Sequence, residues 1–403
     1  MNAAIINVGT MVSGDIENDV LEADAIRIKD GKIRAIGTAE EIGANSADLV
    51  VDANGTTLLP GLIDSHTHPV LLMNGPIVRD MHLLERGRSR LQVSGWLEAS
   101  MHAGITSMIS AGELTISGRG RTPVASKELA IAARHAFTHL RYGGVKLHGG
   151  SVFLEKGMTE SDFQEMAAQG VWLVAEVGLG SAQTPEEVIP LADWARKNGM
   201  MVLMHTGGTS LKGSKSSGAD EIIAIQPDVV CHINGGTTGM SMESIRRLIE
   251  ETDLTLELVY IGNPKLLADS VVMLAEKGDL HRVICGSDGP GGVAYSPQSV
   301  LQTVRNIACL TGISPAKAVA MATGNTARVF GLNTGKLEVG READLVLMDA
   351  PSGSVGQDAM TALAAGDIPA IPMVMIDGEI VAMPGKFTPD PNRQAALTKG
   401  ATS

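Results

Sequence analysis

Short apolar runs alternate with amphipathic stretches along residues 59–330. A run of four to eight apolar residues between turn signals is typical of a buried parallel strand. The first strand follows the turn at Pro60-Gly61. The later apolar runs predict strands at Ile105–Ala111, Gly144–His148, Val171–Val177, Met201–His205, Val229–His232, Leu254–Ile261 and Val283–Gly286.

The stretches between these strands carry apolar residues at helical spacing. Four of them predict helices at Thr159–Gln169, with Thr159 as the N-cap, and at Pro185–Asn198, Met242–Glu251 and Leu266–Lys277. Strand–helix units repeated eight times over about 270 residues have the size of a (β/α)8 TIM barrel. We therefore predict such a barrel, an α/β fold, for residues 59–330.

The two ends of the chain have a different pattern. Residues 1–58 read as short strands separated by turns, with Asp30-Gly31 as a hairpin signal, and strands return between residues 340 and 382. We predict one composite β-sandwich domain built from residues 1–58 plus 331–403. From Asp390 onward the tail is polar and weakly patterned, so we expect it to be frayed.

Composition narrows the class of protein. The chain has 32 basic and 45 acidic residues and a net charge of −13, which argues against a nucleic-acid partner or an anionic membrane surface. No basic, apolar leader and no long uncharged apolar stretch occurs, so we expect neither a signal peptide nor a membrane span. The three cysteines form no CxxC pair, and Cys231 and Cys285 are expected to be small core residues. A cytoplasmic enzyme fits these features.

Candidate chemistry lies at the ends of the predicted strands, where a barrel of this kind carries its active site. His66 and His68 are two residues apart on one strand, so both point the same way. Other strands end in His148, Glu176, His205, His232 and Asp288. The interval is 29 residues from Glu176 to His205, 27 to His232, and 56 (two units of 28) to Asp288.

These residue types suit divalent metals. Imidazole and carboxylate groups bind Zn²⁺, Fe²⁺ or Mn²⁺. A carboxylate at Glu176, between the two groups of histidines, is placed to bridge two cations that together activate one water. Asp288, on the last strand, is placed to bind metal weakly and to carry the proton of that water to a leaving nitrogen.

The pattern resembles the amidohydrolase superfamily. The matching pieces are Pro60-Gly61-Leu62-Ile63-Asp64-Ser65-His66-Thr67-His68, the strand ends His205 and His232, Gly286-Ser287-Asp288, and the closing stretch from Gly335 to Val346. The resemblance implies a metal-dependent hydrolase with a composite β-sandwich. It also implies a homo-oligomer, of which a tetramer is one form.

Within that superfamily, the middle of the chain resembles the enamidases of nicotinate fermentation. The similar segments are Val145 to Gly150, Leu154 to Gly157, Gly170 to Gly180, Met204 to Ser210 and His232 to Gly236. Many superfamily members carry a carboxylated lysine on the fourth strand, whereas the enamidases resemble this chain in having a glutamate, which implies the bridging role for Glu176. The resemblance further implies two divalent ions, Zn and/or Fe. The implied reaction converts 6-oxo-1,4,5,6-tetrahydronicotinate to 2-formylglutarate and ammonia.

Four more residues are candidates for binding a small cyclic amide. Lys146 and His148 are two apart on one strand, so both should face the barrel interior, where a polar pair needs partners. We expect substrate contacts or support of the metal ligands from them, with a carboxylated Lys146 as the alternative bridge. Arg119 and Arg121 follow the second strand and suit a carboxylate-bearing substrate, although a solvated loop position is equally consistent. The stretches 69–100 and 289–292 lie at the mouth, where we expect the substrate to be selected.

Other functions remain open at this point. A deaminase, dipeptidase or lactamase of the same superfamily would use the same strand ends. A non-catalytic binding barrel is the alternative from another class, but such a relative should have lost ligands. All six candidate ligands, His66, His68, Glu176, His205, His232 and Asp288, are present here.

Overall fold

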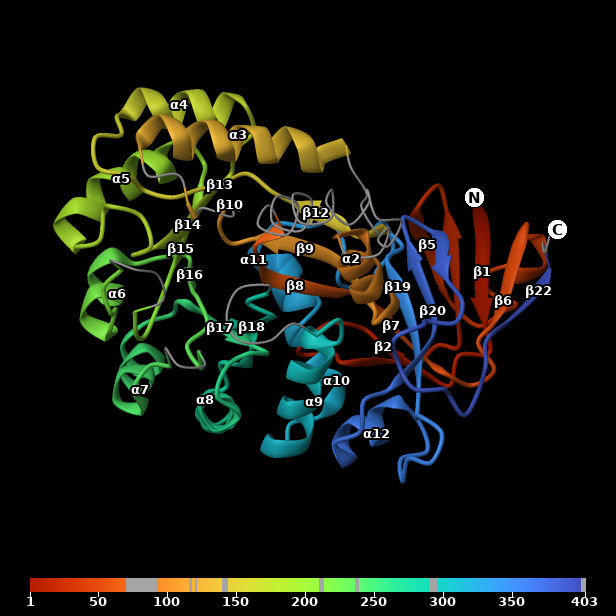
Figure 1. Ribbon diagram of the computed structural model, residues 1–403. Coiled ribbons are helices and arrows are strands. Elements are labelled where there is room, and N and C mark those ends of the chain that lie inside the picture. Colours follow the sequence, from red (N-terminus) through yellow and green to blue (C-terminus); the bar gives the residue numbers. More distant parts are fainter. Residues whose placement is uncertain are drawn as a thin grey trace, which may run out of the picture.

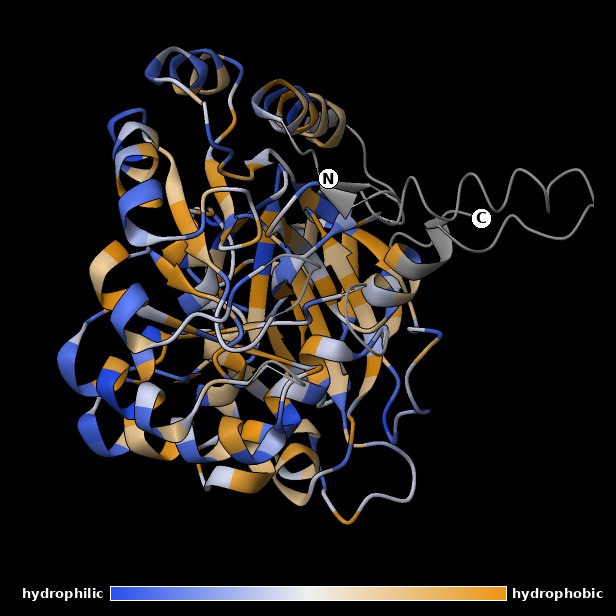
Figure 2. Ribbon diagram, turned by 60° about the vertical axis from the view of Figure 1, so that its left-hand side comes forward, coloured by the Kyte–Doolittle hydropathy of each residue, from blue (hydrophilic) through white to orange (hydrophobic). Residues whose placement is uncertain are grey.

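In a computed structural model of the protein, a parallel barrel ringed by helices lies beside a β-sandwich that contains both ends of the chain (Figure 1). The structure describes residues 1–69, 93–115, 118–119, 122–139, 144–209, 214–235, 239–289 and 296–399. Apolar residues gather in the strands and on the helix faces that cover them (Figure 2). This arrangement confirms the predicted fold class.

The barrel strands are parallel and occupy eight positions in chain order. They are β8 (Leu62–Thr67), β9 (Ile105–Ser110), β12 (Lys146–His148) followed by β13 (Ser151–Val152), β14 (Leu173–Val177), β15 (Met201–Met204), β16 (Val229–Val230), β17 (Thr255–Val259) and β18 (Val283–Gly286). The third position is divided, because β12 pairs with β9 while β13 pairs with β14.

The barrel closes between β18 and β8. The N–H of Asp288 donates to the carbonyl of His66 at 3.0 Å, and Thr67 forms a parallel bridge with Gly289. A Cβ atom on Gly286 would lie only 2.8 Å from the Cβ of His66, so a glycine is needed where the two strands approach. The closure therefore places the end of the last strand beside the first histidine pair.

Helices cover the outside of the barrel. They are α2 (Val93–His102), α3 (Pro123–His139), α4 (Glu160–Ala168), α5 (Pro185–Lys197), α6 (Ala219–Ile225), α7 (Met242–Glu251), α8 (Pro264–Lys277), α9 (Ser299–Thr311), α10 (Pro315–Met321) and α11 (Gly324–Val329). Local sequence explains their ends. Thr159 lies at the N-cap of α4, as predicted, and its N–H donates to Asp162. On α7, Ile245, Leu248 and Ile249 are buried at helical spacing.

The sandwich consists of two sheets. One has the order β22-β6-β1-β4-β5 and the other β21-β20-β19-β7-β2-β3. The strands are β1 (Asn2–Ile6), β2 (Thr10–Val12), β3 (Val20–Leu21), β4 (Ala25–Lys29), β5 (Lys32–Gly37), β6 (Leu49–Asp52), β7 (Thr57–Pro60), β19 (Leu345–Asp349), β20 (Ala370–Ile376), β21 (Glu379–Ala382) and β22 (Ala396–Lys399). Both sheets combine strands from before and after the barrel. The exact domain boundaries stay a prediction.

Four short elements complete the described chain. They are the hairpin of β10 (Leu114–Thr115) and β11 (Gly118–Arg119), the helix α12 (Ala359–Ala365), and the 3₁₀ turns η1 (Ala44–Ser46) and η3 (Leu280–Arg282). None of the helices among all the described residues has the length and apolar character needed to cross a bilayer.

The tail after Asp390 differs from the prediction that it is frayed. β22 pairs antiparallel with β6, and Arg393 forms an ion pair with the buried Asp349. All four side chains of β22 are exposed, so this edge strand is held by backbone hydrogen bonds and carries no apolar alternation. That absence of pattern is why the sequence did not predict it.

Candidate metal centre

The six predicted metal ligands lie together at the C-terminal mouth of the barrel. They come from five strand ends and are His66, His68, Glu176, His205, His232 and Asp288. The histidines and Glu176 are buried, whereas the Asp288 side chain is 21% exposed. The carboxyl ends of neighbouring strands thus bring distant parts of the sequence to one point, as a barrel requires.

Glu176 lies between two pairs of histidines. Its Oε1 is 2.8 Å from His232 Nε2 and 3.2 Å from His205 Nδ1. Its Oε2 is 3.5 Å from His66 Nε2 and 3.6 Å from His68 Nε2. One carboxylate therefore faces both pairs with different oxygens.

Asp288 faces the first pair from the other side. Its Oδ1 is 3.6 Å from His66 Nε2 and 3.8 Å from His68 Nε2. These distances exceed those of hydrogen bonds. Two ligand atoms bound to one tetrahedral zinc ion would be about 3.4 Å apart, given metal–ligand bonds of about 2.1 Å. The separations around His66 are therefore those expected of a shared cation.

In three of the histidines, the ring nitrogen that faces away from Glu176 is held by an oxygen atom, which orients the ring nitrogen that faces Glu176. His68 Nδ1 lies 3.1 Å from the Gly112 carbonyl, His205 Nε2 lies 3.0 Å from the Gly208 carbonyl, and His66 Nδ1 lies 2.7 Å from a carboxylate. A ring nitrogen beside a carbonyl or carboxylate oxygen must donate, so in a neutral ring the opposite nitrogen carries a lone pair. Three neutral rings would therefore direct lone pairs at the Glu176 carboxylate, which is repulsive unless protons or a metal cation lie between them.

A buried nitrogen of His66 also indicates that a cation belongs in this cluster. His66 Nε2 is fully buried and, within the described residues, has no hydrogen-bond partner. A buried polar atom without a partner is costly in free energy. A metal ion would satisfy it, so the residues present fit a metal centre.

Charge within the cluster shifts the pKa values of its members. Burial tends to raise the pKa of Glu176, but the charge of His66 and hydrogen bonds from His205 and His232 outweigh it and hold the pKa well below its ordinary value. Burial likewise opposes ionisation of His66, yet the carboxylates of Glu257 and Glu176 raise its pKa. The carboxylates of the centre therefore carry their charge at neutral pH.

Two of the six residues have a left-handed backbone. The φ angle is 35° at His232 and 56° at Asp288. Such conformations are uncommon outside glycine and often occur at functional sites. They turn both side chains inward from the points where their strands have just ended.

A further acid, Glu257, was missed by the sequence prediction. It lies in the middle of β17, is fully buried, and accepts the hydrogen bond from His66 Nδ1. The signal that could have found it is a lone carboxylate at an inward position of an otherwise apolar strand.

Asp64 is a second buried acid that the prediction did not include. Its Oδ1 accepts from the N–H of His66 at 3.2 Å and from the N–H of Ser287 at 2.8 Å, which ties β8 to the end of β18. Burial raises the pKa of Asp64 to about 7 despite these hydrogen bonds.

Lys146 does face the barrel interior, but not the mouth. Its Nζ lies 2.8 Å from Asp344, 2.7 Å from Glu342 and 2.6 Å from Asp377, which all belong to segments after the barrel. Lys146 begins β12, so it sits at the N-terminal end of the barrel. This placement corrects the prediction that it contacts substrate or bridges metals. The Lys146 ammonium group also occupies the space among these three carboxylates that a metal ion would otherwise fill.

Among the described residues, His148 is in none of the groups of potential metal ligands. Its ring is 6.5 Å from that of Trp172, which precedes β14, and β13 continues the third position beyond it. The mouth end of this position is thus Ser151–Val152, because the pair Gly149-Gly150 interrupts the strand. β12 ends at His148, as predicted, and the third position continues in β13, so a role of His148 in substrate binding stays a prediction.

The two arginine candidates cannot be placed in the same way. β11 ends at Arg119, while the Arg119 side chain and all of Arg121 lie outside the described residues. Residues 70–92 and 290–295, within or beside the stretches expected to select the substrate, also lie outside them.

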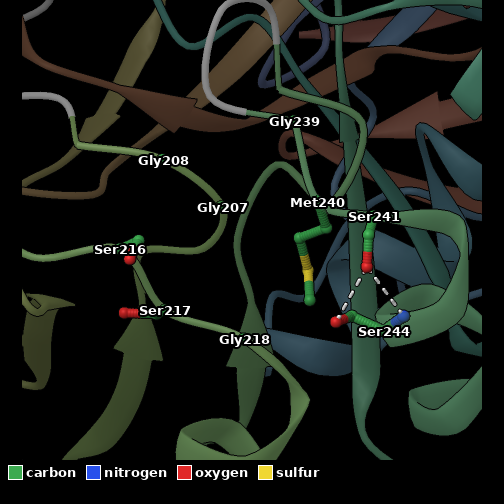
Figure 3. A pocket seen from close by; sticks show the side chains of 9 residues that line it. All are labelled: Gly207, Gly208, Ser216, Ser217, Gly218, Gly239, Met240, Ser241 and Ser244. Atoms are coloured by element: carbon green, nitrogen blue, oxygen red, sulfur yellow. Dashed lines mark hydrogen bonds between the residues drawn. The ribbon is translucent and has the colours of Figure 1, made fainter.

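A pocket of about 220 Å³ borders the loops after β15 and β16 (Figure 3). Gly208, whose carbonyl accepts from His205, lines it together with Ser217 and Met240. Ser241 caps α7 on the far side by accepting from the Ser244 N–H at 3.1 Å. No member of the metal cluster lines this pocket.

A TIM barrel that gathers four histidines and two carboxylates at its mouth defines a metal-dependent hydrolase of the amidohydrolase type. The Amidohydrolase family model matches residues 57–381, and the chain belongs to this family. It is 45% identical over 399 residues to the enamidase of Eubacterium barkeri, covering 98% of this chain and 100% of the relative. The crystal structure of an enamidase superposes with a TM-score of 0.90 at 44% identity, over 98% of this chain and 100% of that one.

Other members are more distant. The imidazolonepropionase of Maricaulis maris is 28% identical over 383 residues, which covers 84% of this chain and 90% of the relative. The β-aspartyl dipeptidase of Fervidobacterium islandicum AW-1 superposes with a TM-score of 0.66 at 20% identity, over 98% and 99% of the two chains. The latter likeness shows the fold alone. The resemblance to the amidohydrolases and to the enamidases is thus confirmed.

Proposed function

We propose that the protein hydrolyses the ring C–N bond of a cyclic enamide, as enamidases do, with 6-oxo-1,4,5,6-tetrahydronicotinate as the substrate. The observation that carries this proposal is the 45% identity to an enamidase along the full length of both chains. The products would be 2-formylglutarate and ammonia, formed with the consumption of two waters.

We further propose that the centre holds two divalent ions, Zn and/or Fe. His66, His68 and Asp288 would bind one, His205 and His232 the other, and Glu176 both, because its two oxygens face the two groups separately. When bound, such ions polarise a carbonyl and lower the pKa of water.

The chain's own residues account for the proton transfers. Asp288 is the most exposed member of the cluster and lies beside the first histidine pair, where an attacking water would approach. Burial tends to raise the pKa of Asp288, but the neighbouring His68 and the charge of His66 lower it, so the side chain is an ionised carboxylate that can accept a proton. It takes the proton from the water that adds to the ring carbonyl and returns it to the ring nitrogen as the C–N bond breaks.

The product of that step is an enamine, which tautomerises to an imine. A second water adds to the imine carbon, and ammonia leaves to give the aldehyde. We propose that Arg119 or Arg121 binds the substrate carboxylate, since the guanidinium group pairs with it in a bidentate manner and both arginines follow the second strand.

The test is to incubate the purified protein with this lactam and to measure ammonia release and the loss of ring absorbance. Imidazolone propionate and a β-aspartyl dipeptide serve as comparison substrates. We expect ammonia from the lactam, at a rate at least tenfold above the comparison substrates. The proposal would be overturned if the protein opened the ring of neither this lactam nor any other cyclic amide.

We also propose a homo-oligomer, such as a tetramer, in the cytoplasm. Cys231, Cys285 and Cys309 are all free thiols, which supports a reducing compartment. Light scattering of the purified protein would test the assembly, and a monomer at all concentrations would overturn that part.

A further inference from the structure

Glu257 is a buried acid with an unusual position. It lies on β17 between Leu256 and Leu258, whose side chains pack in the layer between barrel and helices. Strand alternation therefore turns Glu257 to the barrel interior, where none of its surface is exposed. A carboxylate taken out of water in this way is costly unless it is hydrogen-bonded and paired.

The first set of bonds fixes His66. Oε2 of Glu257 lies 2.7 Å from His66 Nδ1, and Oε1 accepts from the Ser65 hydroxyl at 2.5 Å. With a proton held on Nδ1, the neutral ring of His66 directs the lone pair of Nε2 toward Glu176 and Asp288. Glu257 thus determines both the tautomer and the ring orientation of His66.

The second bond reaches the other half of the centre. The same Oε2 accepts from the N–H of His232 at 3.2 Å. His232 has a φ angle of 35°, a conformation that needs support from its surroundings. Glu257 supplies that support at the residue whose side chain lies 2.8 Å from Glu176.

Glu257 is not itself a metal ligand in this arrangement. His66, Cys231 and Glu257 place potential ligand atoms close together. However, the 2.7 Å between His66 Nδ1 and Glu257 Oε2 leaves no room for an ion, since two ligands on one zinc ion are about 3.4 Å apart. Burial also raises the pKa of the Cys231 thiol, which disfavours the thiolate that metals bind.

We propose that Glu257 is a positioning residue of the metal centre, which orients His66 through its ring and His232 through its backbone. One carboxylate thereby supports a ligand in each half of the centre. The inference rests on the metal-dependent function proposed above and extends it to a residue that binds neither metal nor substrate.

Two substitutions separate the hydrogen bonds from the charge. In Glu257→Gln the amide oxygen can still accept from His66 and His232 while the charge is lost. In Glu257→Leu both are lost. Removing such a supporting partner costs about 10- to 100-fold in metal affinity, so we expect values near the lower end for the glutamine variant and near the upper end for the leucine variant.

The matched control is Glu113→Gln. Glu113 is also a buried glutamate, but it accepts from the N–H groups of Gly150 and Ser151 and bonds no residue of the metal cluster within the described chain. Its substitution should leave metal affinity close to that of the wild type, because the bonds that it changes are those to Gly150 and Ser151.

The experiment strips metal from the full-length proteins and titrates them with Zn²⁺ against a chromophoric chelator. The visible spectrum of the Co²⁺-loaded proteins and the thermal midpoints with and without metal are recorded in parallel. We expect both Glu257 variants, but not Glu113→Gln, to bind Zn²⁺ more weakly and to shift the cobalt spectrum. A merely structural role would lower the midpoint of the apoprotein without changing either readout.

Each outcome has a distinct meaning. Wild-type affinity and spectrum in both Glu257 variants would overturn the inference and leave the proposed function intact. A wild-type protein that binds no metal would overturn both. If Glu257→Leu does not fold, Glu257→Gln and Ser65→Ala decide, because Ser65→Ala removes one bond that orients the carboxylate and should weaken Zn²⁺ binding severalfold.

Discussion

Glu176 Oε1 lies 2.8 Å from His232 Nε2, while the other oxygen of the same carboxylate is 3.5 Å from His66 Nε2. Residues from the first, fourth and sixth strand positions therefore meet at one side chain. Any change at Glu176 should affect both halves of the centre together.

We expect Glu176→Gln to lower bound metal from about two equivalents to fewer than one, because an amide is a weaker ligand and cannot bridge two cations. Activity should fall by more than about 100-fold, the upper range seen for residues that only support a ligand. Metal analysis by mass spectrometry measures the first effect and ammonia release the second. Glu187→Gln, at a surface ion pair with Lys156, is the control and should retain full metal content.

Asp288→Asn should separate proton transfer from metal binding. The loss of a general acid–base residue typically lowers kcat by about 10²- to 10⁴-fold. We expect that loss with little change in KM and with at least one metal equivalent retained, because all four histidines and Glu176 remain. Steady-state kinetics with metal analysis checks this. A variant with wild-type kcat would exclude the proton-transfer role of Asp288.

Lys146→Met should destabilise the fold without disturbing the metal centre. The substitution leaves Asp344 buried and unpaired, which typically costs about 3–5 kcal/mol in the free energy of unfolding. Urea unfolding measures this, and Zn²⁺ affinity should be unchanged. Lys265→Met is the control, since the Lys265–Asp269 pair is on the surface and worth about 1 kcal/mol or less. Lost metal affinity with normal stability would contradict this assignment.

The contribution of Lys146 should depend on pH in a defined direction. Burial tends to lower the pKa of Lys146, but Asp344 and its other partners outweigh burial and raise it above 10.5. A raised folded pKa gives stability that is complete below pH 10.5 and is lost as the pH rises through the folded value. The stability difference between the wild type and Lys146→Met should therefore be constant from neutral pH to about pH 9 and shrink at higher pH.

Much of the barrel was predictable because its signals are local. Apolar runs and helical spacing mark each element, and the end of each strand indicates which residues reach the mouth. The positions of the strand ends alone therefore predict one group of six residues, namely His66, His68, Glu176, His205, His232 and Asp288. The structure places these six within contact of one another.

Other features depend on partners that a local pattern does not reveal. Strand alternation correctly predicted that Lys146 faces the barrel interior. It could not predict that the ammonium group pairs with Asp344, 198 residues away, at the N-terminal end of the barrel. Glu257 is the one charged residue of an otherwise apolar strand. Its role in orienting a metal ligand follows only from its contact with His66, 191 residues away in the sequence. The division of the third strand position at Gly149-Gly150, with β12 paired to β9 and β13 to β14, was likewise not predicted from the local pattern.

The order of strands in the first sandwich sheet has a consequence for biosynthesis. β6 is flanked by β1, which precedes it in the chain, and by β22, which follows the whole barrel segment. The barrel segment can leave the ribosome complete while β6 still presents an open edge, and the acids that neutralise Lys146 are also yet to emerge. The first sandwich sheet and the ion pairs of Lys146 can therefore be completed only after the barrel segment has been synthesised, and a nascent chain stalled before β19 would leave a buried lysine without its acids and a strand edge unpaired.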